Sequence, residues 1–123
     1  MLKDDFYTVD KIDKLSENEY DAFIQLNRDH TIFEGHFPGK PIVPGVCMLQ
    51  IVKEIVSSLI NKNISLKVSK NIKFTALIDP TINSYLRLNL LIDESEGGEI
   101  KVKNTSYFGT TGAVKMDLNY VIG

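Results

Sequence analysis

Alternating apolar and polar residues predict most of the strands of this chain. Between Tyr20 and Leu26 the even-numbered residues are all apolar, which is the period of a strand with one buried face. The segment from residue 5 to residue 12 alternates poorly and is left open between a strand and a short helix. Four further strands are predicted from the apolar sets Ile72, Phe74, Ala76 and Ile78; Leu86, Leu88, Leu90 and Ile92; Ile100 and Val102; and Val114, Met116, Leu118 and Tyr120.

Glycine-containing segments separate the last three predicted strands. The sequence ESEGGE spans residues 94–99, and GTTG spans residues 109–112. Glycine and its polar neighbours tolerate the positive φ angles of tight turns. We therefore expect the C-terminal half of the chain to form an antiparallel meander.

One long helix is predicted, from about Pro44 to Asn61. Its polar residues recur at the spacing of one helical stripe, and they are Gln50, Lys53, Glu54, Ser57, Ser58 and Asn61. Apolar residues cover most of the remaining circumference, so other elements must nearly surround this helix. Since those elements are mainly antiparallel strands, we expect an α+β fold in which a curled sheet of five or six strands wraps around one central helix.

Length and composition narrow the class of protein. The chain has 123 residues, 43% of them hydrophobic, which suffices for one compact core, so residues 1–123 are expected to form a single domain. A formal net charge of -2 argues against nucleic-acid binding through bulk positive charge. The first residues lack the pattern of a signal peptide, and no apolar run reaches membrane-spanning length. The single cysteine, Cys47, cannot form an internal disulfide, so we expect a reducing compartment, the cytoplasm.

Candidate chemistry is concentrated in the stretch GHFPGKPIVPGVCMLQ, which leads into the predicted helix. Pro38 and Pro41 fix their own φ angles and restrict the residues before them, which places His36 in a stiff loop. Pro44 suits the start of a helix, and Gly45 allows a close approach to the backbone. Free amides at a helix N-terminus can bind an oxyanion or polarise a carbonyl, so a nearby histidine suits acid–base chemistry. A tight connector with His36 as a capping or packing residue is the alternative that the spacing leaves open.

The sequence GHFPGKPIVPGV resembles the motif of the 3-hydroxyacyl-acyl carrier protein dehydratases, the FabA/FabZ branch of the hotdog-fold superfamily. Histidine, Phe-Pro-Gly and Pro-Gly-Val occur together at the family's spacing, just before a helix. The segment KNIKFTALIDP, from Lys70 to Pro80, is similar to the strand that this family places after its central helix. The resemblance implies a hotdog fold, which agrees with the arrangement expected from the hydrophobic pattern.

The resemblance also implies a reaction. These enzymes remove water from a 3-hydroxyacyl thioester carried on the phosphopantetheine of acyl carrier protein, which gives a trans-2-enoyl thioester. His36 would be the base that takes the C2 proton, and the backbone amide of Gly45 would hold the thioester carbonyl. Further contacts to the substrate would come from Phe37, Pro38, Gly39 and Val46. No metal and no cofactor bound by the chain itself are expected.

The second catalytic position departs from the family's pattern. The family places a carboxylate fourteen residues after the histidine, where this chain has Gln50. Glutamine can position a hydroxyl by hydrogen bonding, but it cannot deliver a proton at neutral pH. Losing a general acid typically lowers the rate by a factor of about 10²–10⁴. Glu54 is the nearest substitute, but it lies about 6 Å further along the helix axis, and we do not expect it to take over.

Three functional hypotheses follow from this departure. In the family the active site is shared across a homodimer, so His36 would face the partner subunit's Gln50. The chain is then a dehydratase with an altered pair of groups, a subunit of a hetero-oligomeric dehydratase in which a paralogue supplies the carboxylate, or a non-catalytic acyl- or carrier-protein-binding subunit. A hotdog thioesterase is a weaker alternative, because such enzymes generally lack the HFPG loop. Cys47 has no basic neighbour in the sequence and is interpreted as a packing residue.

The expected partners follow from the same resemblance. We expect a homodimer or a larger assembly of dimers, with acyl carrier protein as the substrate-bearing partner and with neither nucleic acid nor membrane. Acyl carrier protein is acidic, so basic residues are expected around the site. The candidate docking residues are Lys40, Lys62, Lys67, Lys70 and Lys73, with a solvated face as the alternative. His30 lacks the clustered ligands of a metal site and is interpreted as a surface loop residue.

Overall fold

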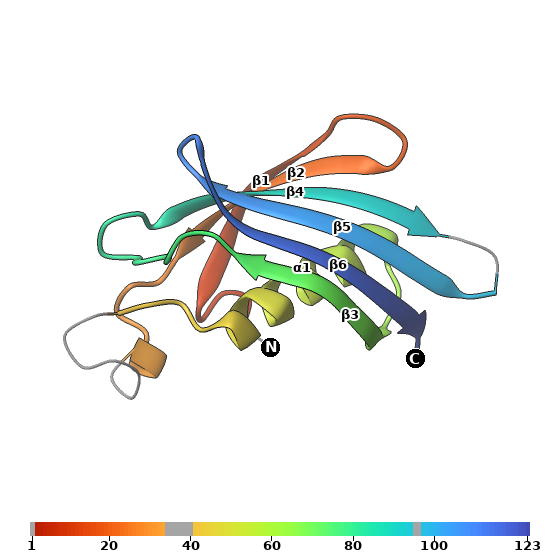
Figure 1. The fold of residues 1–123 in the computed structure, drawn as a ribbon, viewed down its shortest axis with the longest axis horizontal. Helices are drawn as coiled ribbons and strands as arrows, with labels where there is room; N and C mark the ends of the chain where they lie inside the picture. Colours follow the sequence, from red (N-terminus) through yellow and green to blue (C-terminus); the bar gives the residue numbers. More distant parts are fainter. Residues whose placement is uncertain (1, 34–40, 95–96) are drawn as a thin grey trace.

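The computed structural model describes residues 2–33, 41–94 and 97–123. Six strands form one sheet in the order β1-β2-β4-β5-β6-β3, and every neighbouring pair is antiparallel. The strands are β1 (Tyr7–Lys14), β2 (Glu19–Leu26), β3 (Ile64–Phe74), β4 (Tyr85–Glu94), β5 (Glu99–Phe108) and β6 (Thr111–Ile122). The helix α1 spans Gly45–Ile60, and a short 3₁₀ helix, η1, spans Thr31–Phe33. The sheet curls over α1 (Figure 1), which confirms the predicted α+β hotdog arrangement.

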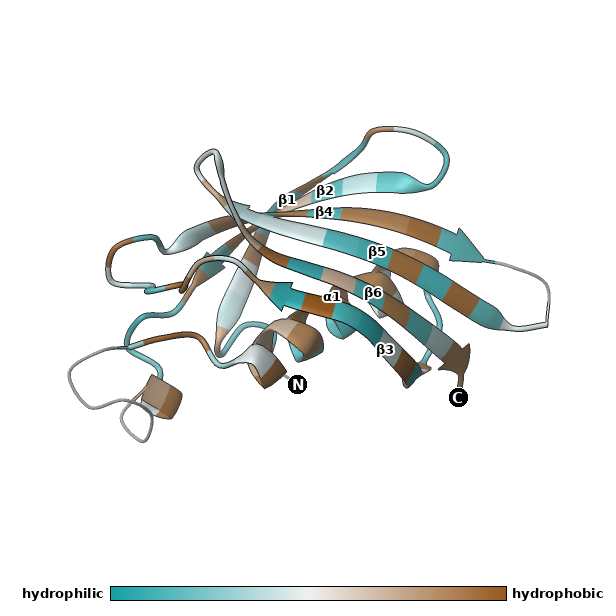
Figure 2. Cartoon of the chain, viewed as in Figure 1, coloured by the Kyte–Doolittle hydropathy of each residue, from teal (hydrophilic) through white to brown (hydrophobic). Residues whose placement is uncertain are grey.

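The hydrophobic core lies between α1 and the inner face of the sheet. The helix buries Cys47, Met48, Ile51, Val52, Ile55 and Val56. Along β5 and β6 the side chains alternate between buried and more exposed positions, and Figure 2 shows the matching alternation of hydrophobic and hydrophilic residues. Because successive side chains of a strand point to opposite faces, the hydrophilic set lies on the outer face of the sheet, away from α1.

Proline and asparagine mark the two ends of α1. Pro44 is the N-cap residue in an extended conformation, a position where its missing N–H is not needed by the helix. Asn61 has a φ of 55°, the left-handed conformation, and its N–H donates to the carbonyl of Ser57. The predicted helix is therefore confirmed, with these two residues as its caps.

The glycine-rich turns of the predicted meander are also confirmed. Gly97 and Gly98, with φ angles of 86° and 78°, lie between β4 and β5, and Gly109, with a φ of 60°, lies between β5 and β6. These conformations favour glycine because a Cβ atom is disfavoured there. The strands β4, β5 and β6 pair consecutively, as the C-terminal pattern predicted.

The boundaries of β3 differ from the prediction. The alternation at residues 72–78 predicted a strand there, but β3 runs from Ile64 to Phe74. This strand lies at the edge of the sheet and nearly all its side chains are exposed, so most of it has no apolar alternation. The residues after it still follow β6, since the N–H of Thr75 donates to the carbonyl of Ala113 at 2.8 Å.

Two further expectations are resolved by the structure. The segment left open between strand and helix contributes most of its residues to β1. Val46 was counted among the apolar residues of a nearly surrounded helix, but its side chain is 72% exposed, so the first turn of α1 is open on one side. Within the described ranges, no helix is long and apolar enough to cross a membrane.

Candidate functional site

An apolar pocket opens at the N-terminus of α1. Its volume is about 400 Å³, and it is lined by Ile42, Val43, Pro44, Gly45, Phe74, Ala76, Leu77 and Ile78. The segment before α1 and the segment after β3 meet here, because the N–H of Val43 donates to the carbonyl of Ile78 at 2.9 Å. A concave site with a hydrophobic lining suits an alkyl chain or another apolar group.

Gly45 lies against the aromatic ring of Phe74. A Cβ atom added at Gly45 would come within 2.9 Å of Cζ of Phe74, which is closer than such contacts normally are. The close approach expected at this glycine is therefore made by a side chain of β3. Phe74 is 49% exposed, so its ring borders the pocket rather than filling the core.

The backbone N–H groups in the first turn of α1 differ in their hydrogen bonding. The carbonyl of Pro44 accepts hydrogen bonds from the N–H groups of Cys47 at 3.0 Å and Met48 at 3.3 Å. In the part of the chain that the structure describes, the N–H groups of Gly45 and Val46 have no acceptor. Such groups at the positive end of a helix dipole favour negative charge. They are suited to polarise the carbonyl of a bound ester or thioester.

Gln50 is directed toward Glu54, one turn further along α1. Nε2 of Gln50 donates a hydrogen bond to Oε2 of Glu54 at 2.7 Å. Residues four apart lie on the same side of a helix, which brings these two side chains together. Because a carboxylate can only accept, the carboxamide is oriented with its nitrogen toward Glu54 and its oxygen Oε1 turned away.

Glu54 also holds the N-terminal segment of the chain. Its carboxylate accepts the N–H of Leu2 at 2.8 Å, the N–H of Lys3 at 2.9 Å and the hydroxyl of Tyr7 at 3.1 Å. Partial burial raises the pKa of Glu54, but the hydrogen bonds from Leu2, Gln50, Lys3 and Tyr7 together outweigh it, so the pKa is lowered. Burial and the adjacent negative charge of Glu54 raise the pKa of the Tyr7 hydroxyl.

Neither Gln50 nor Glu54 can therefore act as a proton donor at neutral pH. Gln50 has no acidic proton, and Glu54 is an ionised acceptor surrounded by donors. This electrostatic environment supports the expectation that Glu54 does not replace the missing acid. The pair can instead position a ligand, because Oε1 and the second N–H of Gln50 can hydrogen-bond to a hydroxyl.

The N-terminal donors of Glu54 were not predicted from the sequence. Tyr7 is only 1% exposed, and it lies 47 positions from Glu54 along the chain. No local pattern links these residues, because their contact depends on β1 and α1 meeting in the fold. In the structure Leu2, Lys3 and Tyr7 of the same chain contact the polar stripe of α1 at Glu54.

The loop residues assigned by the resemblance lie outside the described residues. They are His36, Phe37, Pro38, Gly39 and Lys40. Of the other assigned residues, Gly45 lines the apolar pocket, Val46 lies on the exposed side of the first helical turn, and Gln50 is bonded to Glu54. The role of the histidine as a base stays a prediction from the motif.

The candidate docking lysines separate into two kinds of environment. Lys62 forms an ion pair with Glu94 at 3.0 Å, and Lys67 forms one with Glu99 at 2.5 Å. The hydrogen bond and the positive charge of Lys67 lower the pKa of Glu99. The two remaining candidates that the structure describes lie further along β3, are exposed, and make no ion pair with any residue in the described ranges.

The surroundings of His30 and Cys47 indicate structural roles. Nδ1 of His30 accepts the N–H of Ile32 at 3.0 Å, so its ring proton lies on Nε2, which is 2.9 Å from Oδ2 of Asp5. Cys47 is 3% exposed and burial raises the pKa of its thiol, which supports a packing role. Among the described residues, no group of His, Cys, Asp and Glu side chains could hold a metal ion.

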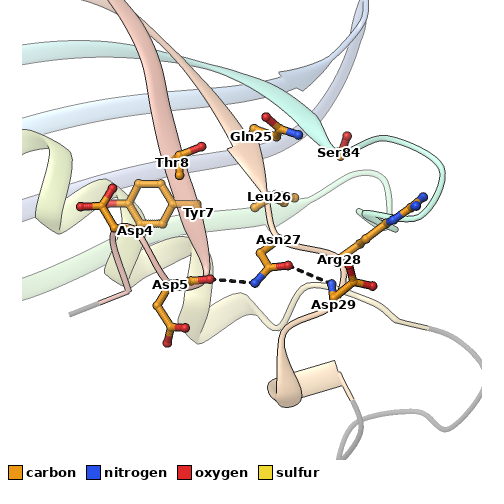
Figure 3. A pocket seen from close by; sticks show the side chains of 10 residues that line it. All are labelled: Asp4, Asp5, Tyr7, Thr8, Gln25, Leu26, Asn27, Arg28, Asp29 and Ser84. Atoms are coloured by element: carbon orange, nitrogen blue, oxygen red, sulfur yellow. Dashed lines mark hydrogen bonds between the residues drawn. The ribbon is translucent and has the colours of Figure 1, made fainter.

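A polar pocket of about 470 Å³ lies beside the N-terminal segment (Figure 3). Its lining was not predicted and consists of Asp4, Asp5, Tyr7, Thr8, Gln25, Leu26, Asn27, Arg28, Asp29 and Ser84. Nδ2 of Asn27 donates to the carbonyl of Asp5 at 3.0 Å, and Oδ1 of Asn27 accepts the N–H of Asp29 at 3.0 Å. These bonds join the N-terminal segment to the loop after β2, so Asn27 serves the fold.

Comparison with known protein families decides where the chain belongs. The model of the ApeI-like family, described as ApeI dehydratase, matches residues 12–110. This chain belongs to the ApeI-like dehydratase family. The matched region of this ApeI-like protein includes all of α1, and with it Gly45, Gln50 and Glu54.

Curated relatives of this ApeI-like chain are 3-hydroxyacyl-[acyl-carrier-protein] dehydratases named FabZ. The FabZ of Lactiplantibacillus plantarum is 25% identical over 123 residues, which covers 94% of this chain and 82% of the relative. The FabZ of Rickettsia africae is 27% identical over 109 residues, which covers 81% of this chain and 74% of the relative. These comparisons place the ApeI-like chain among FabZ-related hotdog dehydratases.

Solved structures share the fold of this ApeI-like chain at low sequence identity. The dehydratase heterocomplex ApeI:P from Xenorhabdus doucetiae superposes with a TM-score of 0.73 at 19% identity, and the match covers 92% of this chain and 96% of that one. A hypothetical thioesterase from Streptococcus pneumoniae, solved with coenzyme A, gives a TM-score of 0.68 at 7% identity, covering 95% and 85%. At these identities the likeness concerns the hotdog fold.

Proposed function

We propose that this ApeI-like chain takes part in the dehydration of a 3-hydroxyacyl thioester. The observation that supports this reaction best is the apolar pocket at the start of α1 beside the first-turn amides of Gly45 and Val46. The acyl chain would lie in the pocket, and the amides would polarise the thioester carbonyl. Polarisation of that carbonyl acidifies the proton on C2, which is the first requirement of the reaction.

The proposed reaction eliminates water across C2 and C3. His36 takes the proton from C2, and the electron pair of that C–H bond forms the C2–C3 double bond. The C3–O bond breaks, and the hydroxyl leaves as water after gaining a proton. The products are a trans-2-enoyl thioester and water. The names of the FabZ relatives support acyl carrier protein as the bearer of the thioester.

In this proposal Gln50 positions the C3 hydroxyl without protonating it. Glu54 fixes the orientation of the carboxamide, so Oε1 of Gln50 can accept a hydrogen bond from the substrate hydroxyl. Accepting such a bond holds the hydroxyl but does not turn it into a better leaving group. The proton for the leaving water is then the one that His36 has taken from C2, or one from solvent water, so the elimination balances without an acid at position 50.

A subunit of a heteromeric dehydratase is the second candidate function. The Gln50–Glu54 bond favours it, because a homodimer of this chain presents no acid at the helix position. A paralogous partner with a carboxylate at the equivalent position would complete one site with His36. The similar structure from Xenorhabdus doucetiae is that of a dehydratase heterocomplex, which supports considering such an assembly here. One version of this hypothesis is that the chain has a non-catalytic role within the assembly.

The deciding experiment compares the purified wild type with His36→Ala on a 3-hydroxyacyl thioester of pantetheine. Turnover by the wild type that is lost in His36→Ala supports a dehydratase that works with the altered pair. Turnover only after adding a co-purifying paralogue, lost again with His36→Ala, supports the heteromeric enzyme. If the co-purified assembly turns over equally well with either form, this chain is a non-catalytic subunit. If no assembly dehydrates the substrate, the proposed reaction is wrong.

A further inference from the structure

A row of alternating cations and aromatic rings crosses the outer face of four neighbouring strands. The register pairs Lys11 of β1 with Phe23 of β2, Phe23 with Arg87 of β4, and Arg87 with Tyr107 of β5. Directly paired residues of neighbouring strands project to the same face. The residues on either side of Arg87 in β4 are buried, so these four side chains, called the aromatic–cation row, face away from α1.

The cations of the aromatic–cation row lie over its rings. Nζ of Lys11 is 4.7 Å from the centroid of the Phe23 ring, and Cζ of Arg87 is 4.2 Å from the centroid of the Tyr107 ring. Such contacts favour fixed positions for both cationic groups at the surface. A contact with a ring uses none of the N–H groups of a guanidinium in a conventional hydrogen bond, so these groups stay available to an acceptor.

The guanidinium of Arg87 has donors that no described residue uses. Its side chain is 35% exposed and makes one ion pair, from Nη1 to Oδ1 of Asp21 at 3.5 Å, and no hydrogen bond to any residue that the structure describes. Oδ1 of Asp21 in turn accepts a hydrogen bond from Nδ2 of Asn89 at 3.0 Å. Arginine carries five N–H donors, which suit two oxygen atoms of one anion. Arg87 can therefore bind a phosphate group without giving up a hydrogen bond.

A hollow of about 460 Å³ lies beside the aromatic–cation row, and all four residues of the row contribute to its lining. The other lining residues include Asp10, Tyr85 and Gly109. Tyr85 is 63% exposed, so its ring is accessible to a ligand. An added Cβ atom at Gly109 would meet only open space, which leaves room for a ligand on this side of the hollow. An accessible ring close to two cations suits a flat ring system that carries an anionic group.

A β-bulge brings a carboxylate to the same hollow. The pairing of β1 with β2 shifts between Val9 and Lys11, so Asp10 is the extra residue of this bulge. Asp10 and Lys11 both line the hollow, although successive residues of a regular strand point to opposite faces. Asp10 is exposed, and its carboxylate has no ion pair or hydrogen bond in the described part of the chain. A carboxylate in such a position can accept hydrogen bonds from the hydroxyls of a ribose.

We propose that this hollow binds a nucleotide, with its base against Tyr85, its phosphates on Arg87 and Lys11, and its ribose hydroxyls on Asp10. An inorganic anion would leave the ring unused, and a simple aromatic acid would leave Asp10 without a donor. The carboxylates of Asp13, 3.4 Å from Nζ of Lys11, and of Asp21 reduce the local positive charge, so a moderate affinity is expected.

The inference goes beyond the proposed function, because this hollow shares no lining residue with the apolar pocket at α1. Two sources supply the required chemical group: free nucleotides, and the nucleotide end of coenzyme A. Binding is measured in the absence of any acyl substrate, so its outcome is separate from that of the dehydration assay.

The test measures binding of ADP, adenosine, pyrophosphate and coenzyme A to the purified protein by titration calorimetry at low ionic strength. Lys11→Gln/Arg87→Gln removes the two cations, Tyr85→Leu removes the ring, and Tyr85→Phe keeps it. The matched control is Lys101→Gln/Lys115→Gln, which removes the same charge from exposed positions of the outer face that do not line this hollow. Circular dichroism checks that each variant is folded, and Tyr85→Leu changes only an exposed side chain.

We expect ADP to bind more tightly than adenosine or pyrophosphate, since only ADP contacts both the ring and the cations. Lys11→Gln/Arg87→Gln and Tyr85→Leu should each raise the dissociation constant for ADP by about tenfold or more, while Tyr85→Phe and the control should bind like the wild type. Tighter binding of coenzyme A than of ADP would identify the coenzyme as the source, and equal or weaker binding would identify the free nucleotide.

Three results would overturn the inference. ADP that binds no more tightly than pyrophosphate, or equally well to Tyr85→Leu and the wild type, would show a general attraction of anions to the surface. An equal loss of binding in the control variant would show the same. Absence of ADP binding at millimolar concentrations would show that the aromatic–cation row only covers the outer face of the sheet.

Discussion

Nε2 of Gln50 donates to the ionised carboxylate of Glu54 at 2.7 Å, across one turn of α1. Three donors from the N-terminal segment hold the same carboxylate, so Glu54 stays charged and Gln50 stays oriented. The position where related dehydratases are expected to hold an acid is thus occupied by an oriented carboxamide. The effects of this arrangement on activity and on stability can both be measured.

Replacing Gln50 by glutamate should create a proton donor. The new carboxyl group would lie beside the ionised Glu54, and repulsion between the two negative charges raises the pKa of the group with fewer donors. Glu54 keeps the bonds from Leu2, Lys3 and Tyr7, so the new glutamate takes the proton. We expect Gln50→Glu to raise kcat by a factor of about 10²–10⁴ for the proposed reaction. Steady-state assays of carrier-bound substrate across the pH range measure this gain.

The double variant Gln50→Glu/Glu54→Gln is the matched control for that experiment. It keeps the new carboxyl group but removes the neighbouring negative charge. As the pH rises, the activity of the double variant should fall at a lower pH than that of Gln50→Glu, because the pKa of the new carboxyl group is no longer raised. Identical profiles for the two variants would contradict the electrostatic coupling described for this pair.

Replacing Glu54 by glutamine should destabilise the fold in a pH-dependent way. The hydrogen bonds lower the pKa of Glu54 in the folded chain, so the ionised form favours the folded state. At pH 7 we expect Glu54→Gln to lower the free energy of unfolding by about 1–3 kcal/mol. The full difference in free energy of unfolding between wild type and variant is present above about pH 4.3, the ordinary pKa of glutamate. This difference shrinks as the pH falls through the lowered pKa of Glu54 in the folded state. Urea denaturation at several pH values tests this, and a gap that widens in acid would contradict it.

Two tyrosines should stay protonated in alkaline solution until the protein unfolds. Burial and the charge of Glu54 raise the pKa of Tyr7, and burial raises the pKa of Tyr120. The phenolate absorbance of the wild type should therefore rise in a final step that coincides with loss of circular dichroism. In Tyr7→Phe/Tyr120→Phe that final step should disappear while the earlier titration stays the same. A change in the earlier titration instead would mean that these side chains are accessible in the folded protein.

The contact between Gly45 and Phe74 predicts a rescue experiment at the apolar pocket. Gly45→Ala places a methyl group within 2.9 Å of the ring, so the half-exposed ring, which lines the pocket, has to shift. We expect a modest loss of stability, about 1 kcal/mol, and a higher KM for the acyl substrate. Phe74→Ala removes the ring and with it the collision. The double variant Gly45→Ala/Phe74→Ala should therefore be about as stable as Phe74→Ala alone. Equal penalties for Gly45→Ala with and without the ring would show that the ring is not the obstacle.

The sequence predicted the elements whose one face is buried. Along β4 and β6 the period of two is clear because every second side chain packs against α1. The helix was predicted for the same reason, with Pro44 and Asn61 at its ends. β3 was misplaced because an exposed edge strand has no buried face to leave a pattern in its sequence.

The candidate site could be predicted only where a local motif carries it. Gly45 and Gln50 were found because both lie at a fixed distance from the histidine of the HFPG loop. The grouping of Glu54 with Tyr7 joins residues 47 positions apart in the sequence. Such groupings depend on strand order and register, which the hydrophobic pattern of one chain does not determine.

β3 contains a β-bulge at Asn71, where φ is 51° and the three steps from Lys70 to Lys73 match two steps from Asp117 to Lys115 on β6. This bulge affects how related chains should be compared. A one-residue deletion between Lys70 and Lys73 would restore the regular pleat and still leave both lysines on the outer face, whereas removing the bulge at constant length would turn one of them toward α1. A sequence alignment that matches only the two lysines would miss this difference. In homologues, the strand length between the two cations and the presence of a left-handed residue between them are the features to compare. Together they show whether two lysines that are aligned in sequence also lie on the same face of the sheet.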